Sequence, residues 1–203
     1  MYLTKLRLDI RRENIQKALG DCSEMHRDIQ RMFGCERKAA NILYRLVDNG
    51  GHPSVYIYSD KPLNADMVTV GGYSWVASMD MTDALNSIKE GDSFRFELVA
   101  YPSKKVRSSE GHHSKRVPIK TPAEQIDWLL RQANNKGFRV LDVTINKGSS
   151  DLVRVTSKVP PLRFKRICFA GVLEVIDRDA FKESVCKGIG PEKAYGMGML
   201  MLV

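Results

Sequence analysis

The order of apolar patterns along the 203-residue chain passes through the same cycle twice, and this repetition constrains the fold more than any other feature. In the first half, alternating apolar side chains predict a strand over residues 2–10. An apolar stripe at helical spacing then predicts a helix, with Ser23 as its N-cap and Gly34 at its end. Two strands, a short helix and a strand near residues 73–77 complete the strand–helix–strand–strand–helix–strand order that is typical of a ferredoxin-like fold.

The second half repeats this order after a predicted boundary at residues 88–92. Its first helix opens on a capping box at residues 121–124 and ends at Gly137. We therefore expect an α+β protein of two tandem ferredoxin-like (βαββαβ) domains, over residues 1–88 and 92–203, each built on an antiparallel sheet. The other elements predicted for the second half are strands over residues 94–100, 138–145, 167–176 and 197–203 and a helix over residues 179–187.

The positive charge is concentrated in two short stretches. The formal net charge is +8, and residues 103–120 and 154–166 together carry all of this excess. A concentrated positive charge is typical of a protein that binds a polyanion, although two solvated loops of a basic protein would give the same pattern. The cations of the two stretches are Lys104, Lys105, Arg107, Lys115, Arg116 and Lys120, followed by Arg154, Lys158, Arg163, Lys165 and Arg166.

Several other classes of protein do not fit the sequence. Because there is no run of 18 apolar residues and no basic leader before an apolar block, we expect neither membrane association nor export, and we place the protein in the cytoplasm. The cysteines form no C-x-x-C pair, and no cluster of metal-ligating residues is evident, so we expect no metal and no other cofactor. The four cysteines, expected to be free buried thiols, are Cys22, Cys35, Cys168 and Cys186.

Five segments in order resemble CasE, the family of CRISPR repeat endoribonucleases of the type I-E Cascade complex. They are residues 1–6 (MYLTKL), 24–27 (EMHR), 120–129 (KTPAEQIDWL), 169–175 (FAGVLEV) and 188–198 (GIGPEKAYGMG). The resemblance covers the chain from its first residue to its last, and the glycine-rich segment with Lys193 is its most specific part. It implies tandem ferredoxin-like domains that bind a repeat hairpin and cleave at the base of its stem without a metal. It also implies 5′-hydroxyl and 2′,3′-cyclic phosphate products, and mature guide RNA that stays bound beside other Cascade subunits.

His26 is the candidate catalytic residue. Metal-free RNA cleavage needs a group that takes the proton of the attacking 2′-hydroxyl and a group that protonates the leaving 5′-oxygen, and histidine suits either role. Helical spacing places His26 at the margin of the apolar stripe, with Arg27 and Arg31 on the polar side where they can hold a phosphate. From spacing alone, His26 also fits a surface histidine on a basic helix, whereas the resemblance to CasE implies a catalytic histidine at this position.

One residue departs from the family pattern. Some CasE proteins have a catalytic tyrosine three residues before this histidine, where the present chain has Ser23. The second proton-transfer group therefore stays open, and so does an alternative function as a non-catalytic RNA-binding subunit of a CRISPR effector complex. Ser149 and Ser150 are candidate phosphate contacts, but they also fit a plain turn.

The basic stretches provide most of the predicted RNA contacts. Residues 154–166 fit a hairpin around Pro160 and Pro161 that binds the RNA stem, and residues 103–116 are assigned to flanking phosphates. The glycines near Lys193 permit close approach of either RNA or a neighbouring part of the protein. The full predicted set of RNA-binding residues is Arg27, Arg31, Lys104, Lys105, Arg107, Lys115, Arg116, Arg154, Lys158, Arg163, Lys165, Arg166 and Lys193.

Overall fold

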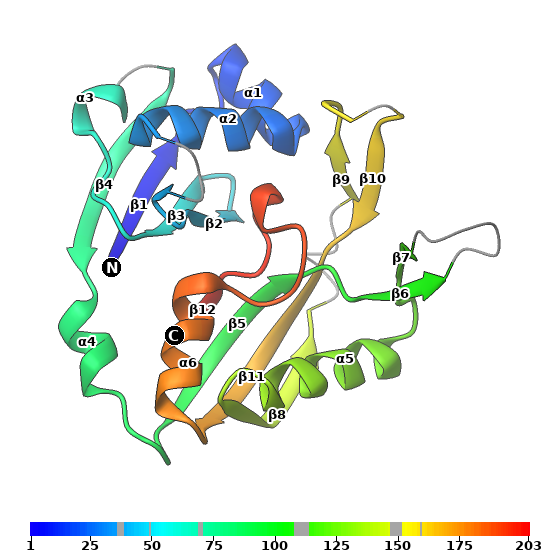
Figure 1. Ribbon diagram of the computed structural model, residues 1–203. Coiled ribbons are helices and arrows are strands. Elements are labelled where there is room, and N and C mark those ends of the chain that lie inside the picture. Colours follow the sequence, from blue (N-terminus) through cyan, green and yellow to red (C-terminus); the bar gives the residue numbers. More distant parts are fainter. Residues whose placement is uncertain (36–38, 49, 69–70, 108–113, 147–151, 159) are drawn as a thin grey trace.

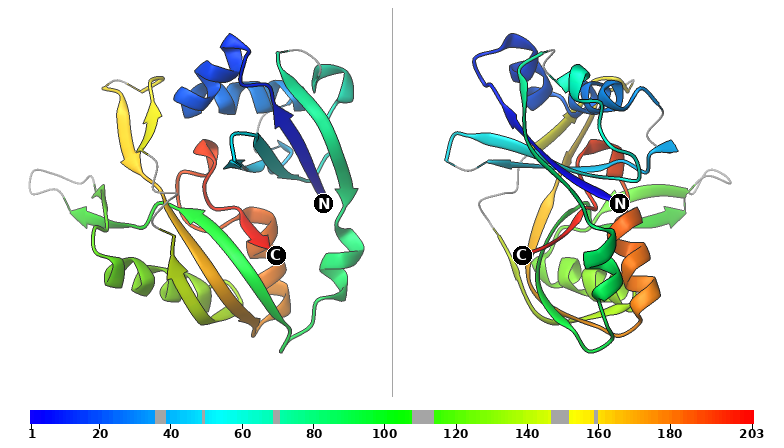
Figure 2. Two further views of the ribbon diagram at one scale, coloured as in Figure 1. Left: turned by 180° about the vertical axis from the view of Figure 1, so that it is seen from behind. Right: turned by 90° about the vertical axis from the view of Figure 1, so that its left-hand side faces the viewer.

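The computed structural model describes the chain except for residues 36–38, 49, 69–70, 108–113, 147–151 and 159 (Figure 1). It contains two four-stranded antiparallel sheets, one from each half of the chain, and two separate two-stranded hairpins. The two sheets lie one above the other in the views of Figures 1 and 2, with the hairpins projecting together from one side. The predicted α+β class and the pair of ferredoxin-like sheets are confirmed.

The N-terminal sheet has the strand order β2-β3-β1-β4, and helices α1 and α2 lie over it at the top of Figure 1. Helix α2 forms because Met25, Ile29 and Met32 recur on one face, where all three are buried against the sheet. The elements of this half are β1 (Tyr2–Leu8), α1 (Glu13–Gly20), α2 (Cys22–Phe33), β2 (Leu43–Asp48), β3 (Pro53–Ser59), α3 (Ala65–Val68), β4 (Tyr73–Asp80) and α4 (Thr82–Ser87).

The C-terminal sheet has the strand order β12-β5-β11-β8, which repeats the order of the first sheet read from its other edge. Its main strands are β5 (Ser93–Ala100), β8 (Phe138–Ile145), β11 (Ile167–Val175) and β12 (Leu200–Leu202). Its helices are α5 (Pro122–Asn134), α6 (Arg178–Lys187) and the 3-10 helix η3 (Lys193–Tyr195). The two hairpins are β6 (Ser103–Arg107) with β7 (Ser114–Pro118), and β9 (Leu152–Val155) with β10 (Leu162–Lys165).

The helix ends confirm two predictions and correct a third. The Thr121 hydroxyl accepts a hydrogen bond from the backbone N–H of Glu124, as the capping box predicts, and Gly34 ends α2 with φ +60°. The prediction of Ser23 as an N-cap is wrong. Asp21 caps α2 instead, and its carboxylate accepts from the Ser23 N–H at 2.8 Å, because the helix begins at Cys22, two residues before the predicted start.

The two halves share one of the hydrophobic cores. Leu43, Tyr58, Leu85 and Ile88 of the first half are buried in the same cluster as the interior of the C-terminal sheet. The first half also has a core of its own beneath α1 and α2. In the described part of the chain, no helix is long and apolar enough to cross a membrane. The boundary at residues 88–92 stays a prediction, although the turn between α4 and β5 falls there.

Candidate functional site

Helix α2 carries His26 to the place where the two halves of the protein meet. His26 is half-buried, one helical turn after Cys22. The same helix contacts η3 from the C-terminal segment and β9 from the second hairpin. His26 thus lies on a helix that is bordered by the N-terminal sheet, the C-terminal segment and a basic hairpin.

The start of α2 is bonded directly to the turn of the β9–β10 hairpin. The Asp21 carboxylate accepts hydrogen bonds from the backbone N–H of Thr156 at 3.3 Å and from the Thr156 hydroxyl. Beside it, the hydroxyls of Ser23 and Ser157 are 2.9 Å apart. Burial opposes ionisation of Asp21, but the hydrogen bonds from Thr156 and Ser23 outweigh it and lower the pKa of the carboxyl. Asp21 therefore joins the helix to the hairpin as a carboxylate.

A second contact fixes α2 on the N-terminal sheet. The Tyr73 hydroxyl donates to Asp28 at 3.1 Å, and burial raises the pKa of Asp28. The two predicted phosphate-binding arginines of this helix are exposed, and each forms an ion pair with an acid three residues before it, Arg27 with Glu24 and Arg31 with Asp28. Such exposed pairs are weak, so both guanidinium groups remain accessible to a phosphate.

A cavity of about 190 Å³ lies beside the first turn of α2. Its walls include Cys22, Met25, Arg154, Arg166 and Tyr195. Burial is the main cause that raises the pKa of Tyr195, and nearby Glu192, Cys22 and Asp21 raise it further. Tyr195 is therefore a neutral phenol at physiological pH, and a neutral phenol can give up a proton.

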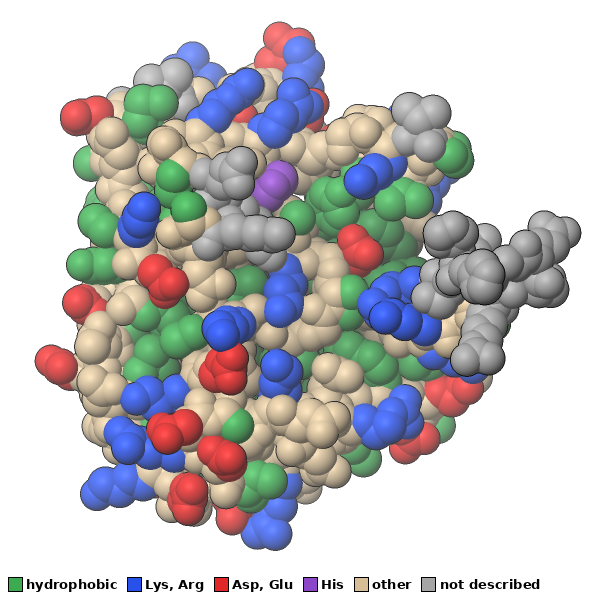
Figure 3. All heavy atoms as spheres, viewed as in Figure 1, with side chains coloured by type: hydrophobic (Ala, Val, Ile, Leu, Met, Phe, Trp, Pro, Cys, Tyr) green, Lys and Arg blue, Asp and Glu red, His purple; other side chains and the backbone are tan. Residues whose placement is uncertain are grey.

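The β9–β10 hairpin has one apolar and one basic face. Val153, Val155 and Phe164 are buried in a small core, while Arg154 and Arg163 are partners across the two strands and both are exposed. Lys158, in the turn, is also exposed. Figure 3 shows Lys and Arg side chains on the helices at the top and along both projecting hairpins. The structure thus confirms the hairpin predicted for residues 154–166 and leaves most of its cations at the surface.

The first basic stretch forms a hairpin as well, which apolar periodicity did not predict. Lys105 pairs with Arg116 across the β6 and β7 strands, and both side chains are exposed. Lys104 lies 3.8 Å from Glu124, and Arg116 donates to the Ser103 hydroxyl at 3.2 Å. The predicted residues Arg107 and Lys115 belong to these two strands.

The glycine-rich segment packs against the protein itself. An added Cβ at Gly190 would lie 3.0 Å from the Trp128 ring, and one at Gly196 would lie 3.0 Å from the Tyr44 ring. The Lys193 amino group donates to the Lys187 carbonyl at the end of α6, at 2.7 Å. Contacts within the protein therefore account for these glycines, and Lys193 also has a structural role.

Sequence reasoning missed Asp21, Thr156, Ser157 and Tyr195. The only signal for Asp21 was its position next to the predicted helix start, and nothing in the sequence pairs it with a residue 135 positions later. Ser149, Ser150, His112 and His113 lie outside the described residues. Within the described ranges, no three His, Cys, Asp or Glu side chains form a group suited to a metal ion. Cys168 is buried as expected, whereas the other three cysteines are half-buried thiols.

The sequence and fold match known CRISPR proteins over their full length. A family model described as CRISPR associated protein matches residues 1–203. The CRISPR-associated endoribonuclease Cse3 of Thermus thermophilus is 30% identical over 213 residues, covering 98% of both chains. The Cascade subunit CasE of Escherichia coli is 38% identical over 87 residues, covering 43% of this chain and 42% of that protein.

Solved structures with a similar fold are also CRISPR proteins. A structure of the CRISPR endoribonuclease Cse3 bound to a 19-nucleotide RNA has a TM-score of 0.88 and 28% sequence identity to this chain, with both chains covered completely. The same half-to-half arrangement thus occurs in an RNA-bound relative. The chain belongs to the CRISPR-associated protein family that contains Cse3 and CasE.

Proposed function

We propose that this protein is an endoribonuclease that binds the hairpin of CRISPR repeat RNA and cleaves it at the base of the stem. The position of His26 carries the proposal. It is half-buried on a helix that contacts both η3 and the basic β9–β10 hairpin, in a chain that matches an RNA-bound endoribonuclease from end to end. After cleavage, the protein keeps the mature guide RNA and joins other Cascade subunits, as the name of its relative CasE indicates.

The substrate supplies the nucleophile in this proposal. As the bond between the 2′-oxygen and phosphorus forms, the 2′-oxygen loses its proton. As the bond between phosphorus and the 5′-oxygen breaks, the 5′-oxygen takes up a proton. His26 performs one of these transfers, and the products are a 2′,3′-cyclic phosphate and a 5′-hydroxyl. No metal is required, because the attacking group belongs to the RNA and cationic side chains stabilise the charge on phosphorus.

Tyr195 is the group that we propose for the second transfer. Ser23 occupies the position of the family's tyrosine, but it is only 4% exposed and its hydroxyl lies against Ser157. Tyr195 lines the cavity beside the same helix turn and is held as a neutral phenol. Because a neutral phenol can donate but not accept the proton, Tyr195 would protonate the 5′-oxygen and His26 would deprotonate the 2′-hydroxyl.

Basic side chains provide the remaining contacts in this proposal. Arg154, Lys158 and Arg163 of the β9–β10 hairpin are proposed to bind the stem, and Lys105 and Arg116 of the β6–β7 hairpin to bind flanking phosphates. RNA contacts are also proposed for the other predicted positions. Lys165 and Arg166 would contact the stem, and Lys104, Arg107 and Lys115 the flanking phosphates. Arg27 and Arg31 would hold a phosphate beside His26, and Lys193 is kept as a further RNA contact. If these side chains are only a solvated surface, replacing them would leave the affinity for RNA unchanged.

Replacing His26 tests the catalytic part of the proposal. His26→Ala should bind repeat RNA almost normally and cleave it about 10²–10⁴-fold more slowly, the range for one proton-transfer group. The matched control is His52→Ala, because His52 is an exposed histidine at the hairpin between β2 and β3. Gel assays in EDTA should give the wild-type rate. Activity that is lost in EDTA and restored by Mg²⁺ would refute the metal-free reaction.

The same assay separates this function from the alternative. The alternative is a non-catalytic RNA-binding subunit, and the observation in its favour is the buried Ser23 where some relatives have tyrosine. A wild-type protein that binds repeat RNA tightly but yields no cleaved product would support the alternative.

A further inference from the structure

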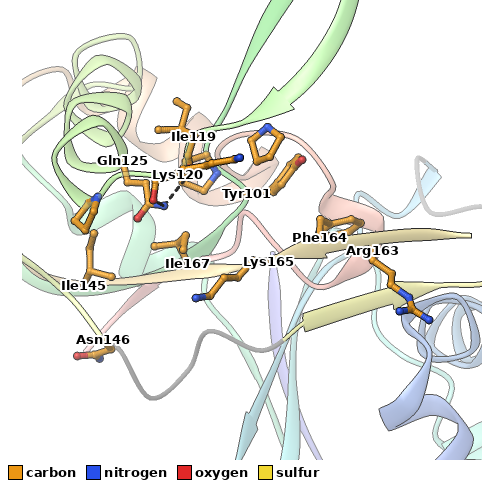
Figure 4. A pocket seen from close by; sticks show the side chains of 13 residues that line it. Tyr101, Ile119, Lys120, Gln125, Ile145, Asn146, Arg163, Phe164, Lys165 and Ile167 are labelled. Atoms are coloured by element: carbon orange, nitrogen blue, oxygen red, sulfur yellow. Dashed lines mark hydrogen bonds between the residues drawn. The ribbon is translucent and has the colours of Figure 1, made fainter.

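A second, larger cavity lies between the bases of the two hairpins, away from the first turn of α2. Its volume is about 680 Å³, which is ample for a nucleotide. Its walls come from β10, the end of β8, the start of α5 and the segments that flank the β6–β7 hairpin. Figure 4 labels ten of the lining residues, among them two lysines, two amides and two aromatic rings. The proposed cleavage chemistry uses none of these groups.

The polar group best placed inside this cavity is the amide of Gln125. Its side chain is only 6% exposed, and its nitrogen donates to the Ile119 carbonyl at 2.9 Å. That bond fixes the orientation of the amide in the wall of the cavity, and Figure 4 shows its oxygen on the side away from the bond. Among the residues that the structure describes, none donates a hydrogen bond to this oxygen. The wall of the cavity therefore carries an oriented acceptor, which favours a ligand with an N–H group.

An aromatic wall stands on the other side of the cavity. The rings of Tyr101 and Phe164 are 5.1 Å apart, and Phe164 in turn lies 6.1 Å from Tyr195. Burial and nearby Glu192 raise the pKa of Tyr101, so its ring is uncharged near neutral pH. A row of three rings thus runs from this cavity to the wall of the cavity beside α2. Flat rings of this kind are the usual surfaces on which proteins stack single bases.

Positive charge lies at the cavity and on both sides of it. Lys165 extends toward the space between Ile145 and Ile167, and Lys120 lies near Tyr101 (Figure 4). The β6–β7 and β9–β10 hairpins add exposed cations on either side. An apolar chamber with an aromatic wall, an amide acceptor and a cationic border matches a nucleotide better than a neutral or cationic ligand.

We propose that this cavity binds one unstacked base from the single-stranded RNA that flanks the stem. The base lies against Tyr101, its amino group donates to the Gln125 oxygen, and its phosphate lies near Lys165. A base within the stem is paired and stacked and cannot enter. Adenine, cytosine and guanine present an exocyclic amino group, whereas uracil has only a ring N–H. The inference rests on the proposed binding of repeat RNA and adds a sequence preference outside the stem.

The test measures the affinity of the full chain for a repeat stem-loop with flanking nucleotides and a 2′-deoxy sugar at the cut, so that no cleavage occurs. Each flanking nucleotide is made abasic in turn. One position should weaken binding by about tenfold, the effect of losing one stacked base. At that position, uracil in place of adenine or cytosine should weaken binding about 3- to 10-fold, the effect of one hydrogen bond.

Protein variants then assign the effect to the cavity. Gln125→Met should abolish the preference against uracil, and Tyr101→Leu should abolish the sensitivity to base removal. Gln16→Met is the matched control, because the Gln16 amide also donates to a backbone carbonyl, at 3.0 Å, but on α1. Lys165→Met should weaken binding of the stem-loop, because the phosphate of the bound base loses its cation. Lys89→Met, at an exposed lysine outside the cavity, is its control. The abasic scan uses the wild-type protein, so it stands even where a variant fails to fold.

The experiment distinguishes failure of the proposed RNA function from failure of the base pocket. If the wild-type protein does not bind the stem-loop, the proposed function is wrong and the base pocket with it. If it binds tightly but no flanking position responds to base removal, the RNA function stands and the base pocket is wrong. If the cavity variants impair association with another protein while every flanking base stays neutral, the cavity is a protein contact and the proposal is overturned.

Discussion

The Asp21 carboxylate accepts hydrogen bonds from both the backbone N–H and the hydroxyl of Thr156, 135 residues later in the chain. This one side chain caps the helix that carries His26 and also holds the turn of the hairpin that we propose to bind the RNA stem. In the proposed function, this direct bond between the two elements fixes the position of His26 relative to the bound stem.

Asp21→Asn should make folding less sensitive to acid. Because the pKa of Asp21 is lowered in the folded protein, its carboxylate stabilises the fold above the unfolded pKa of about 3.9, and that stabilisation is lost as the pH falls through the folded pKa. The variant should lose about 1 kcal/mol at pH 7 and show a shallower fall in unfolding free energy below pH 4.

Urea unfolding as a function of pH checks this prediction, with Asp127→Asn as a control at an exposed acid of α5. Equal pH profiles for the wild-type protein and Asp21→Asn would mean that the charge of Asp21 does not stabilise the fold.

Tyr195→Phe should slow cleavage about 10- to 100-fold without weakening RNA binding, because the phenol would no longer protonate the 5′-oxygen. A substrate with sulfur in place of that oxygen has a leaving group that needs no proton. It should restore the rate of Tyr195→Phe but not that of His26→Ala. If the sulfur substrate rescues the His26 variant instead, the two proton transfers are assigned the wrong way round.

A 2′-deoxy sugar just upstream of the cut should abolish cleavage and leave binding intact, since the attacking oxygen is then absent from the substrate. The measurement is a gel assay with end-group analysis of the products. Products with a 3′-hydroxyl and a 5′-phosphate would identify water as the nucleophile and exclude the proposed reaction.

Removing three cations of the β9–β10 hairpin should weaken binding in a salt-dependent manner. Arg154, Lys158 and Arg163 replaced together with alanine should flatten the slope of log affinity against log salt by about 2–3 units, roughly one for each lost phosphate contact. The loss should be smaller for a single-stranded RNA of equal length. Unchanged affinity and slope for the stem-loop would show that the hairpin does not bind the stem.

The sequence was sufficient to predict the elements whose apolar spacing is regular. The stripe of Met25, Ile29 and Met32 predicts α2, alternation predicts β1, and apolar-rich runs predict the other main strands of both sheets. Helix α1 was missed because Ile15 and Ala18 are the only buried residues among its eight. The β6–β7 hairpin was missed because basic, largely exposed strands show no clear alternation.

The residues of the candidate site also fall into those that local sequence patterns predict and those that they do not. His26 follows from local spacing and from the resemblance to CasE, and the basic β9–β10 hairpin follows from local charge. The contacts of Asp21 with Thr156 and of Ser23 with Ser157 join positions more than 130 residues apart, and no local pattern encodes such a pairing. The role proposed for Tyr195 likewise depends on how the C-terminal segment folds back against α2.

The core shared by the two halves has a consequence for synthesis on the ribosome. The first half can close its own interior beneath α1 and α2 as soon as β4 has emerged. Leu43, Tyr58, Leu85 and Ile88 then form an apolar surface that stays uncovered until the C-terminal strands are made. The last strand of that sheet, β12, ends one residue before the C-terminus. The nascent chain must therefore carry this apolar surface from the completion of α4 until the C-terminal strands emerge, which makes it the surface that a chaperone would protect.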